Sequence, residues 1–167
     1  MSRRGPSGFN TVGLDYCGPL RYRKGEGDIV KCYICLFTCT SSRAVHLELV
    51  SNLSTEAFLR AFRKFTARRG IPAVISDNFS SFKKAFKDLD AVSKSSLVRR
   101  EAADRRIQWD FIVEYSPWHG GFYERLVKEV KDSLKKVLKF AILDWDELQT
   151  VLVEIESASS QFPTSVL

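Results

Sequence analysis

The hydrophobic period of this sequence changes near Ser54, and that change limits the folds open to the chain. Residues 43–50 (RAVHLELV) alternate as a half-buried strand does. Residues 57–65 instead place their apolar side chains on one face of a helix, with Ser54 as N-cap and Gly70 as the stop. The short strand PAVIS follows at once. A strand, a helix and a strand with such short joints predict a crossover that brings the last strand parallel to a neighbour.

The segment before this crossover predicts an antiparallel meander. Residues 9–16 form a plausible first strand that Gly18-Pro19 breaks, and the turn RKGEGD leads into a second strand over about 29–39. Residues 43–50 make the third strand. Because the connections are short, consecutive strands should pair antiparallel.

The second half of the chain predicts helices around one further strand. We expect a short helix around Phe82 to Leu89, a Ser-rich and charge-rich connector to about 106, and a strand in IQWDFIV. The run PWHGG then breaks the chain before a long helix over about 121–140. A final helix, opened by Asp144, should end near Ser157.

Length and composition indicate one folded domain over residues 9–167, preceded by a disordered basic segment at residues 1–8. The longest strongly apolar run, Cys32 to Phe37, is far too short to cross a bilayer, so we expect no membrane partner. The segment MSRRGPSG has no apolar core, and no signal peptide is visible.

The formal charge is +6, and the basic residues are clustered around positions 21–24, 60–69, 83–87 and 99–106 rather than spread along the chain. A polyanion such as nucleic acid is the natural partner of such clusters. The alternative is that these residues form ordinary solvated helix faces.

Cys32 and Cys35 have a spacing that superficially resembles a metal or redox pair. They lie in a β-branched and aromatic run, and strand positions three apart point to opposite faces. We therefore interpret them as small core residues in a reducing compartment, with zinc as the minor alternative.

Three carboxylates stand out by position. Asp15 lies near the end of the first strand, Asp77 ends the strand after the crossover, and Glu124 falls in the expected first turn of the long helix. Sites in such folds gather at the C-terminal edge of parallel strands, which favours a shared site. Each acid has an alternative role, as a turn residue, an N-cap or an acid at a helix N-terminus.

The long helix adds an independent observation. At 100° per residue, an arc of about 80° holds an acid and four cations, whereas the apolar residues lie on another face. The charged residues are Glu124, Lys128, Lys131, Lys135 and Lys139, and the apolar ones are Leu126, Val130, Leu134 and Val137. This stripe suits a metal site beside a phosphate backbone. An amphipathic helix with a Glu-Lys pair is the alternative.

Several blocks of the sequence resemble the catalytic core of retroelement integrases, most closely those of BEL/Pao-type long-terminal-repeat retrotransposons. The blocks are GLDYCGPL, CLFTCTSSRAVHLELV, ARRGIP, ISDN, HGGFYERLVKEVK and LQTVLVEIE, and they occur in the expected order from about Phe9 to Pro163. SRAVHLEL and GGFYER are the most specific of them.

The resemblance implies an RNase H-like α/β fold: a five-stranded mixed sheet, three antiparallel strands followed by two parallel ones, with helices on both faces. It implies that Asp15, Asp77 and Glu124 are a catalytic triad that binds two Mg²⁺ or Mn²⁺ ions. Between these acids lie 61 and then 46 residues. The connector at 88–106 would accommodate the second, longer gap.

The implied activity is DNA integration by a polynucleotidyl transferase. Hard divalent cations prefer oxygen ligands, and two ions about 4 Å apart can activate a hydroxyl and stabilise the leaving oxygen at phosphorus. Water first trims the 3′ ends of the element, and the exposed 3′-OH then attacks target DNA. The resemblance also implies a homodimer or higher oligomer that acts in the nucleus, with a cytoplasmic phase.

Other matched positions have a weaker basis. Asn78 could bond near the metals or DNA, and His119 could contact phosphate. Trp118 could stack or pack, whereas His46, inside a strand, is interpreted as structural.

The sequence departs from the family pattern in ways that leave alternatives open. Phe79 stands where the family has Gly, and Ser160-Gln161-Phe162-Pro163 stands where it has an Asn-Ser-Arg-Pro motif. The two histidines are 73 residues apart, so the His-x₃₋₅-His spacing of the family's N-terminal zinc domain is missing, and we expect the C-terminal domain to be absent too. Alternatives are a nuclease of the same fold, or a catalytically silent, degenerate or domesticated DNA-binding or oligomerisation module.

Overall fold

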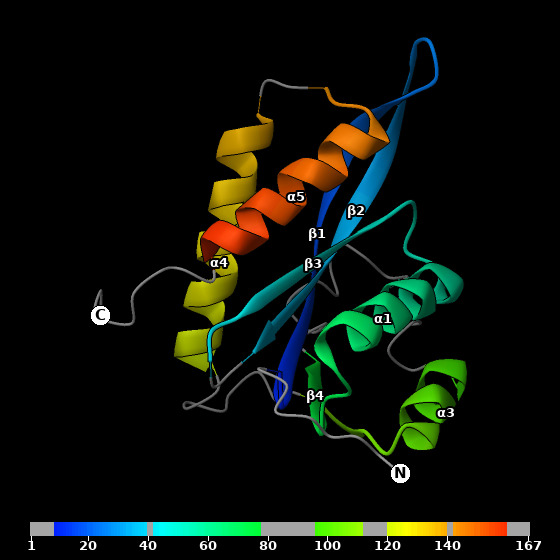
Figure 1. Cartoon of the computed structure of the whole chain (residues 1–167), viewed down its shortest axis with the longest axis vertical. Coiled ribbons are helices and arrows are strands. Elements are labelled where there is room, and N and C mark those ends of the chain that lie inside the picture. Colours follow the sequence, from blue (N-terminus) through cyan, green and yellow to red (C-terminus); the bar gives the residue numbers. More distant parts are fainter. Residues whose placement is uncertain (1–8, 40–41, 78–95, 112–119, 140–141, 160–167) are drawn as a thin grey trace.

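A computed structural model describes residues 9–39, 42–77, 96–111, 120–139 and 142–159, and for 76–77, 108–111 and 120–124 it describes the backbone alone. These residues form one mixed sheet with helices on both faces (Figure 1). The strands are β1 (Thr11–Lys24), β2 (Asp28–Cys39), β3 (Val45–Val50), β4 (Val74–Asp77) and β5 (Gln108–Phe111). The helices are α1 (Thr55–Arg69), α3 (Ser96–Asp104), α4 (Gly120–Leu138) and α5 (Trp145–Ser159).

The five strands lie in the order β3-β2-β1-β4-β5. β1 pairs antiparallel with β2, and β2 pairs antiparallel with β3, so the predicted meander is confirmed. β4 lies parallel to β1, and β5 lies parallel to β4. The crossover through α1 therefore joins the edge strand β3 to the strand on the far side of β1.

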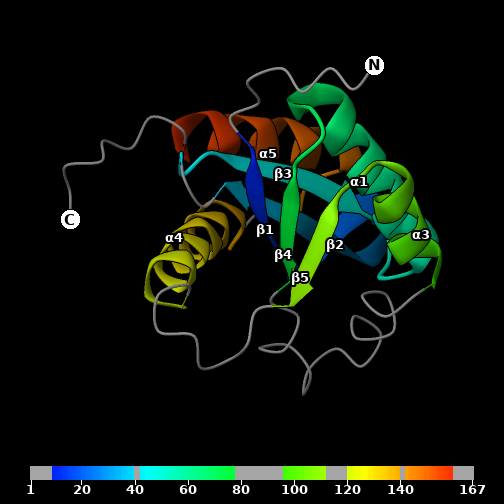
Figure 2. The same cartoon turned by 90° about the horizontal axis from the view of Figure 1, so that it is seen from below.

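Two hydrophobic cores lie on opposite faces of the sheet. One packs α1 and α3 under the sheet residues Val12, Leu14, Phe37 and Ile75. The other packs α4 and α5 against Ile34, Leu36, Leu47 and Leu49. Figure 2 shows α4 and α5 towards the left of the strands and α1 and α3 towards the right. The expected helices on both faces are confirmed, and β1 lies between the two cores.

Helix α1 forms as its sequence predicts. Ser54 caps it by accepting a hydrogen bond from the Ala57 N–H at 3.2 Å. Gly70 ends it at a φ of 87°, a left-handed conformation that favours glycine. Its apolar stripe is buried, as expected, and consists of Ala57, Phe58, Ala61, Phe62 and Phe65.

The first strand does not end at Gly18-Pro19, contrary to prediction. β1 continues to Lys24, and a register shift between Cys17 and Leu20 absorbs the irregularity. Gly18 has a φ of 140°, and a Cβ built there would stand 2.8 Å from Tyr33 Cδ1. Glycine thus permits a bulge that passes the proline without ending the strand.

The predicted connector before β5 is also partly wrong. Residues 96–104 form α3, which buries Val98 and Ala102, four positions apart on one helix face. The helix expected around 82–89 lies outside the described residues.

Helix α4 begins and ends slightly earlier than predicted, at Gly120 and Leu138. Its buried side chains are Val127, Val130 and Leu134, whereas Val137, which we had placed on the apolar face, is half exposed. α5 opens as predicted, because the Asp144 carboxylate accepts from the Glu147 N–H at 2.8 Å. No described helix is long and apolar enough to cross a membrane.

The cysteines follow the alternation of their strand. Cys32 lies in the core under α4 and α5, whereas Cys35 lies in the core under α1. Because the two thiols point to opposite faces, they cannot bind one metal ion together.

A polar cluster with three buried members, His46, Glu48 and Glu156, lies at β3, the edge strand of the sheet. His46 Nε2 lies 2.7 Å from Glu48 Oε1, and its Nδ1 lies 3.3 Å from Glu156 Oε1 on α5. Arg69, the last residue of α1, contacts both His46 Nδ1 and Glu156. We call His46, Glu48, Arg69 and Glu156 the edge cluster. It joins α1, β3 and α5, which confirms that His46 is structural.

Protonation of His46 would change the bonding in the edge cluster. Burial lowers the pKa of His46, but hydrogen bonds to Glu156 and Glu48 raise it more, so the pKa lies above its ordinary value. Neutral Nδ1 accepts from Arg69, whereas protonated Nδ1 donates to Glu156. For Glu156, burial raises the pKa, but the hydrogen bonds and positive charges of His46 and Arg69 lower it more. The pKa of Glu156 therefore lies below its ordinary value.

Substitution Gly18→Ala should lower the free energy of unfolding by about 1–3 kcal/mol, because the new Cβ meets Tyr33 at a strained φ. Urea denaturation measures this change. Gly27→Ala, at a turn with open space around it, is the matched control and should have little effect. Equal stability of the two variants would contradict the role of Gly18 in the bulge.

Candidate active site

Asp15 lies on β1, the middle strand of the sheet, and it is only 2% exposed. Its neighbours Leu14 and Tyr16 point into the core under α1. Strand alternation therefore directs Asp15 to the opposite face, towards α4. A carboxylate in this position needs a partner, because burial disfavours its charged form.

The partner of Asp15 is Lys131 on α4. Lys131 Nζ lies 3.5 Å from Asp15 Oδ2, and the Tyr16 N–H donates to Asp15 Oδ1 at 2.7 Å. Burial raises the pKa of Asp15 to about 6, although Lys131 and the Tyr16 N–H act to lower it. The Lys131 charge thus compensates only part of the cost of burying this carboxylate.

Asp77 lies beside this site along the backbone. It is the last residue of β4, and its Cα pairs with Leu14 on β1 and with Phe111 on β5. Asp15 is therefore the first residue of β1 beyond the end of β4. The predicted proximity of Asp15 and Asp77 is confirmed for the backbone, and the Asp77 side chain is outside the described part.

Glu124 is the fifth residue of α4, so our placement of it in the first turn was wrong. It precedes Lys131 by seven positions, which puts both on one helix face about 10 Å apart along the axis. The face of α4 that carries position 124 is thus the one that meets Asp15. The Glu124 side chain is not described.

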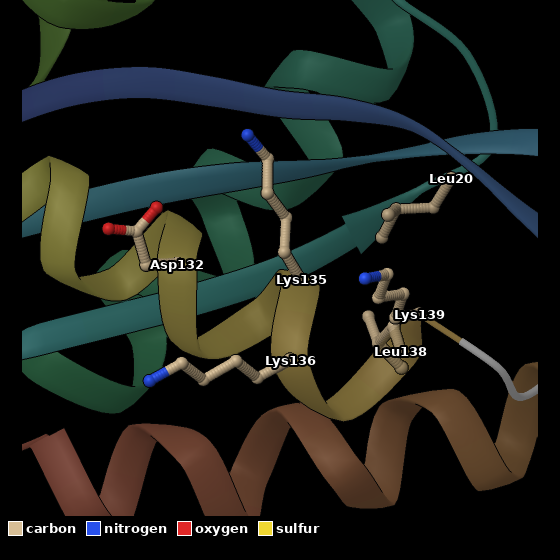
Figure 3. Close-up of a pocket in the computed structure, with 6 residues that line it drawn as sticks. All are labelled: Leu20, Asp132, Lys135, Lys136, Leu138 and Lys139. Carbon is tan, nitrogen blue, oxygen red and sulfur yellow. The ribbon is translucent and has the colours of Figure 1, made fainter.

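The four lysines predicted to share one face of α4, which we call the lysine stripe, differ in their surroundings. Lys131 is drawn into the site by Asp15, where we had predicted a contact to phosphate, and its side chain is 20% exposed. Lys128 and Lys135 are exposed, and Lys139 lies one residue past the helix end. Lys135 and Lys139 border a hollow between α4 and Leu20 of β1 (Figure 3).

Several predicted positions lie outside the described residues, namely Asn78, Phe79, Trp118, His119 and the segment 160–163. Among residues with described side chains, no three His, Cys, Asp or Glu lie close enough to hold a metal ion. Of the predicted triad, only the Asp15 side chain is described, so the triad stays a prediction.

Sequence reasoning missed the contact between Lys131 and Asp15 and the place of Leu20 beside the lysines. The sequence did indicate that Lys131 shares a helix face with Glu124, which could have suggested its contact with an acid of the site. The place of Leu20 could not be predicted in this way, because it depends on the continuation of β1 past Pro19.

Comparison with known proteins shows similarity in structure alone. No protein-family model matches the chain, and no curated protein sequence matches it. Solved structures of retroviral integrases do match, at identities that show the fold only.

Three of these structures share the fold over nearly the whole chain. An integrase chain in the simian T-cell lymphotropic virus intasome, in complex with a PP2A regulatory subunit, has a TM-score of 0.61 and 14% identity over 100% of this chain. The catalytic core domain of BIV integrase has a TM-score of 0.57 and 12% sequence identity over 90% of this chain. The catalytic core domain of HTLV-2 integrase, in complex with magnesium and in a trimeric form, has a TM-score of 0.53 and 17% sequence identity over 94% of this chain. The match covers 52% of the length of the intasome chain, 80% of the BIV core and 86% of the HTLV-2 core.

Substitution Asp15→Asn, which removes the charge and keeps the size, should raise the free energy of unfolding by up to about 3 kcal/mol at pH 7 in the presence of a chelator. The folded-state pKa of about 6 lies above the ordinary 3.8. As the pH rises, the unfolded chain therefore releases the Asp15 proton at a lower pH than the folded chain does. The free energy of unfolding of the wild type falls between these two pKa values.

Urea denaturation at several pH values measures this effect. The difference between variant and wild type should be near zero below about pH 4, grow up to about pH 6 and then stay constant. Asp132→Asn, which removes an exposed acid from α4, is the control and should show no such window. A difference that shrinks with rising pH would exclude the buried charge as its cause.

Proposed function

We propose that this chain is the catalytic core of an integrase-like polynucleotidyl transferase that uses divalent metal ions. The observation that carries the proposal is the position of Asp15. It is a buried carboxylate at the point where β4 ends in Asp77 and α4 crosses the sheet through Lys131. The shared fold with integrase catalytic cores supports the same conclusion.

The chemistry of the site suits a hard divalent cation. Asp15 offers carboxylate oxygens, the ligands that Mg²⁺ and Mn²⁺ prefer, and its raised pKa shows that one lysine leaves the charge incompletely stabilised. Asp77 and Glu124 would complete the ligand set. Two bound ions would supply Lewis-acid activation of a hydroxyl and charge stabilisation at phosphorus.

The residues of the chain have distinct tasks in this proposal. The rigid pairing of β1 with β2 and β4 holds Asp15 and the Asp77 backbone in register. Lys131 neutralises Asp15 and fixes α4 against β1. Lys128, exposed on the same stripe, is free to neutralise a phosphate of the incoming strand.

We propose DNA as the partner, both as element ends to be trimmed at 3′ and as the target to be joined. The formal charge of +6 and the lysines of α4 support a polyanionic substrate. We further propose kinship with BEL/Pao-type elements, a homodimer or higher oligomer, and action in the nucleus. These finer assignments follow from the resemblance of the sequence blocks.

Disintegration, the reversal of strand transfer, tests the proposed activity. With Mn²⁺ and a branched DNA substrate, the wild-type chain should release the joined strand, and Glu124→Gln should lower the rate at least about 100-fold. Glu129→Gln removes an exposed carboxylate five residues along α4 and is the matched control. Its rate should stay within about twofold of wild type.

Asp77→Asn and Asp15→Asn should be as inactive as Glu124→Gln. Strand release by Asp77→Asn at the wild-type rate would contradict the triad. DNA binding by the wild type without any strand release would favour the catalytically silent module.

A further inference from the structure

The end of α4 and Leu20 of β1 border a hollow of about 530 Å³. We call it the α4 groove. Its lining residues are Leu20, Asp132, Lys135, Lys136, Leu138 and Lys139. In Figure 3, Leu20 approaches the last turn of α4 from β1, and Lys135 extends towards the strand.

The α4 groove combines an apolar floor with a cationic rim. Leu20 and Leu138 are partly buried and pack against the core under α4 and α5. Three ammonium groups and one carboxylate surround them, so the lining has a net charge of +2. A ligand that fits must carry negative charge and also present an apolar surface.

We propose that the α4 groove binds the sugar-phosphate backbone of the DNA strand that reacts at Asp15. Phosphates carry the negative charge that Lys135 and Lys139 would neutralise, and deoxyribose presents carbon-bound hydrogens to Leu20 and Leu138. A ribose in the same place would press its 2′-hydroxyl against leucines that offer no hydrogen bond. The groove therefore selects DNA over RNA. This inference rests on the proposed function, because that function places the reacting strand at Asp15.

The distance from Asp15 to the groove sets which nucleotide it holds. Seven residues along α4 separate Lys131, which contacts Asp15, from Leu138, a rise of about 10 Å. Along β1, Leu20 follows Asp15 by five residues, a span of about 15 Å in extended chain. At 3.4 Å per nucleotide of one strand, both distances place the groove about three to four nucleotides from the reacting phosphate.

The cationic rim is tested by the salt dependence of binding. We expect Lys135→Gln/Lys139→Gln to lower the slope of log affinity against log salt by about 2 for a branched DNA duplex, measured by fluorescence anisotropy with a chelator present. Arg60→Gln/Lys64→Gln removes two exposed charges from α1, on the other face of the sheet, and is the matched control. An unchanged slope in the groove variant, or an equal change in the control, would overturn the proposal.

The apolar floor is tested by a ribonucleotide scan of the same branched DNA. One ribonucleotide at a time replaces a deoxyribonucleotide on each side of the branch. We expect affinity to fall about tenfold three to four nucleotides from the reacting phosphate and to change little elsewhere. Leu20→Ser, which offers a hydroxyl partner, should remove this local effect, whereas Leu20→Met should keep it.

A flat scan, or a local effect that Leu20→Ser leaves intact, would overturn the proposal. The outcome is separable from the proposed activity because binding is measured without reaction. Failure of disintegration together with a local ribonucleotide effect would remove the activity and keep the groove. Disintegration with a flat scan would do the reverse.

Discussion

A carboxylate in the middle of a sheet requires a partner of opposite charge, and Lys131 supplies it to Asp15 across the boundary between β1 and α4. This pair joins α4 to β1 beside the apolar contacts that Val127, Val130 and Leu134 make with the sheet. Farther along the same strand, the Arg23 N–H donates to the Leu143 carbonyl at 2.9 Å, and its guanidinium donates to the Ile142 carbonyl at 3.0 Å. One strand therefore positions both α4 and the entry into α5.

The position of β1 explains why the site forms there. β1 has pairing partners on both sides up to Leu14, and beyond that residue β4 ends while β2 continues. In the described part of the chain, Asp15 thus has a strand partner on the β2 side, whereas the pairing of β1 with β4 ends one residue before it. The Asp15 carboxylate is 2% exposed and lies on the α4 face of the sheet, where Lys131 contacts it.

Local patterns predicted the parts of the fold whose causes are local. The cap at Ser54, the stripe of α1 and the stop at Gly70 are encoded within one segment, and all three are confirmed. Cys32 and Cys35 were placed correctly because strand alternation alone decides their faces. α3 was missed because only Val98 and Ala102 of its nine residues are buried, which is a weak apolar pattern.

The errors at the site have long-range causes. Gly18-Pro19 looks like a strand end, and only the neighbouring β2 shows that a bulge carries the strand onward. Lys131 was assigned to phosphate because helix periodicity reveals which residues share a face but not what that face meets. Asp77 ends β4 as predicted, but Asp15, which we had placed near the end of the first strand, is the fifth of the fourteen residues of β1. The two lie near each other along the backbone because β4 ends beside Leu14.

The edge cluster limits how this sequence can change over time. His46 and Glu48 lie on β3, Arg69 ends α1, and Glu156 lies on the distant α5; each contacts a buried member of the cluster. Loss of one member leaves a buried charge or donor without a partner, whereas joint replacement by apolar residues leaves none. Related sequences should therefore keep these four positions together or exchange them together, and covariation between α1, β3 and α5 should be strongest there.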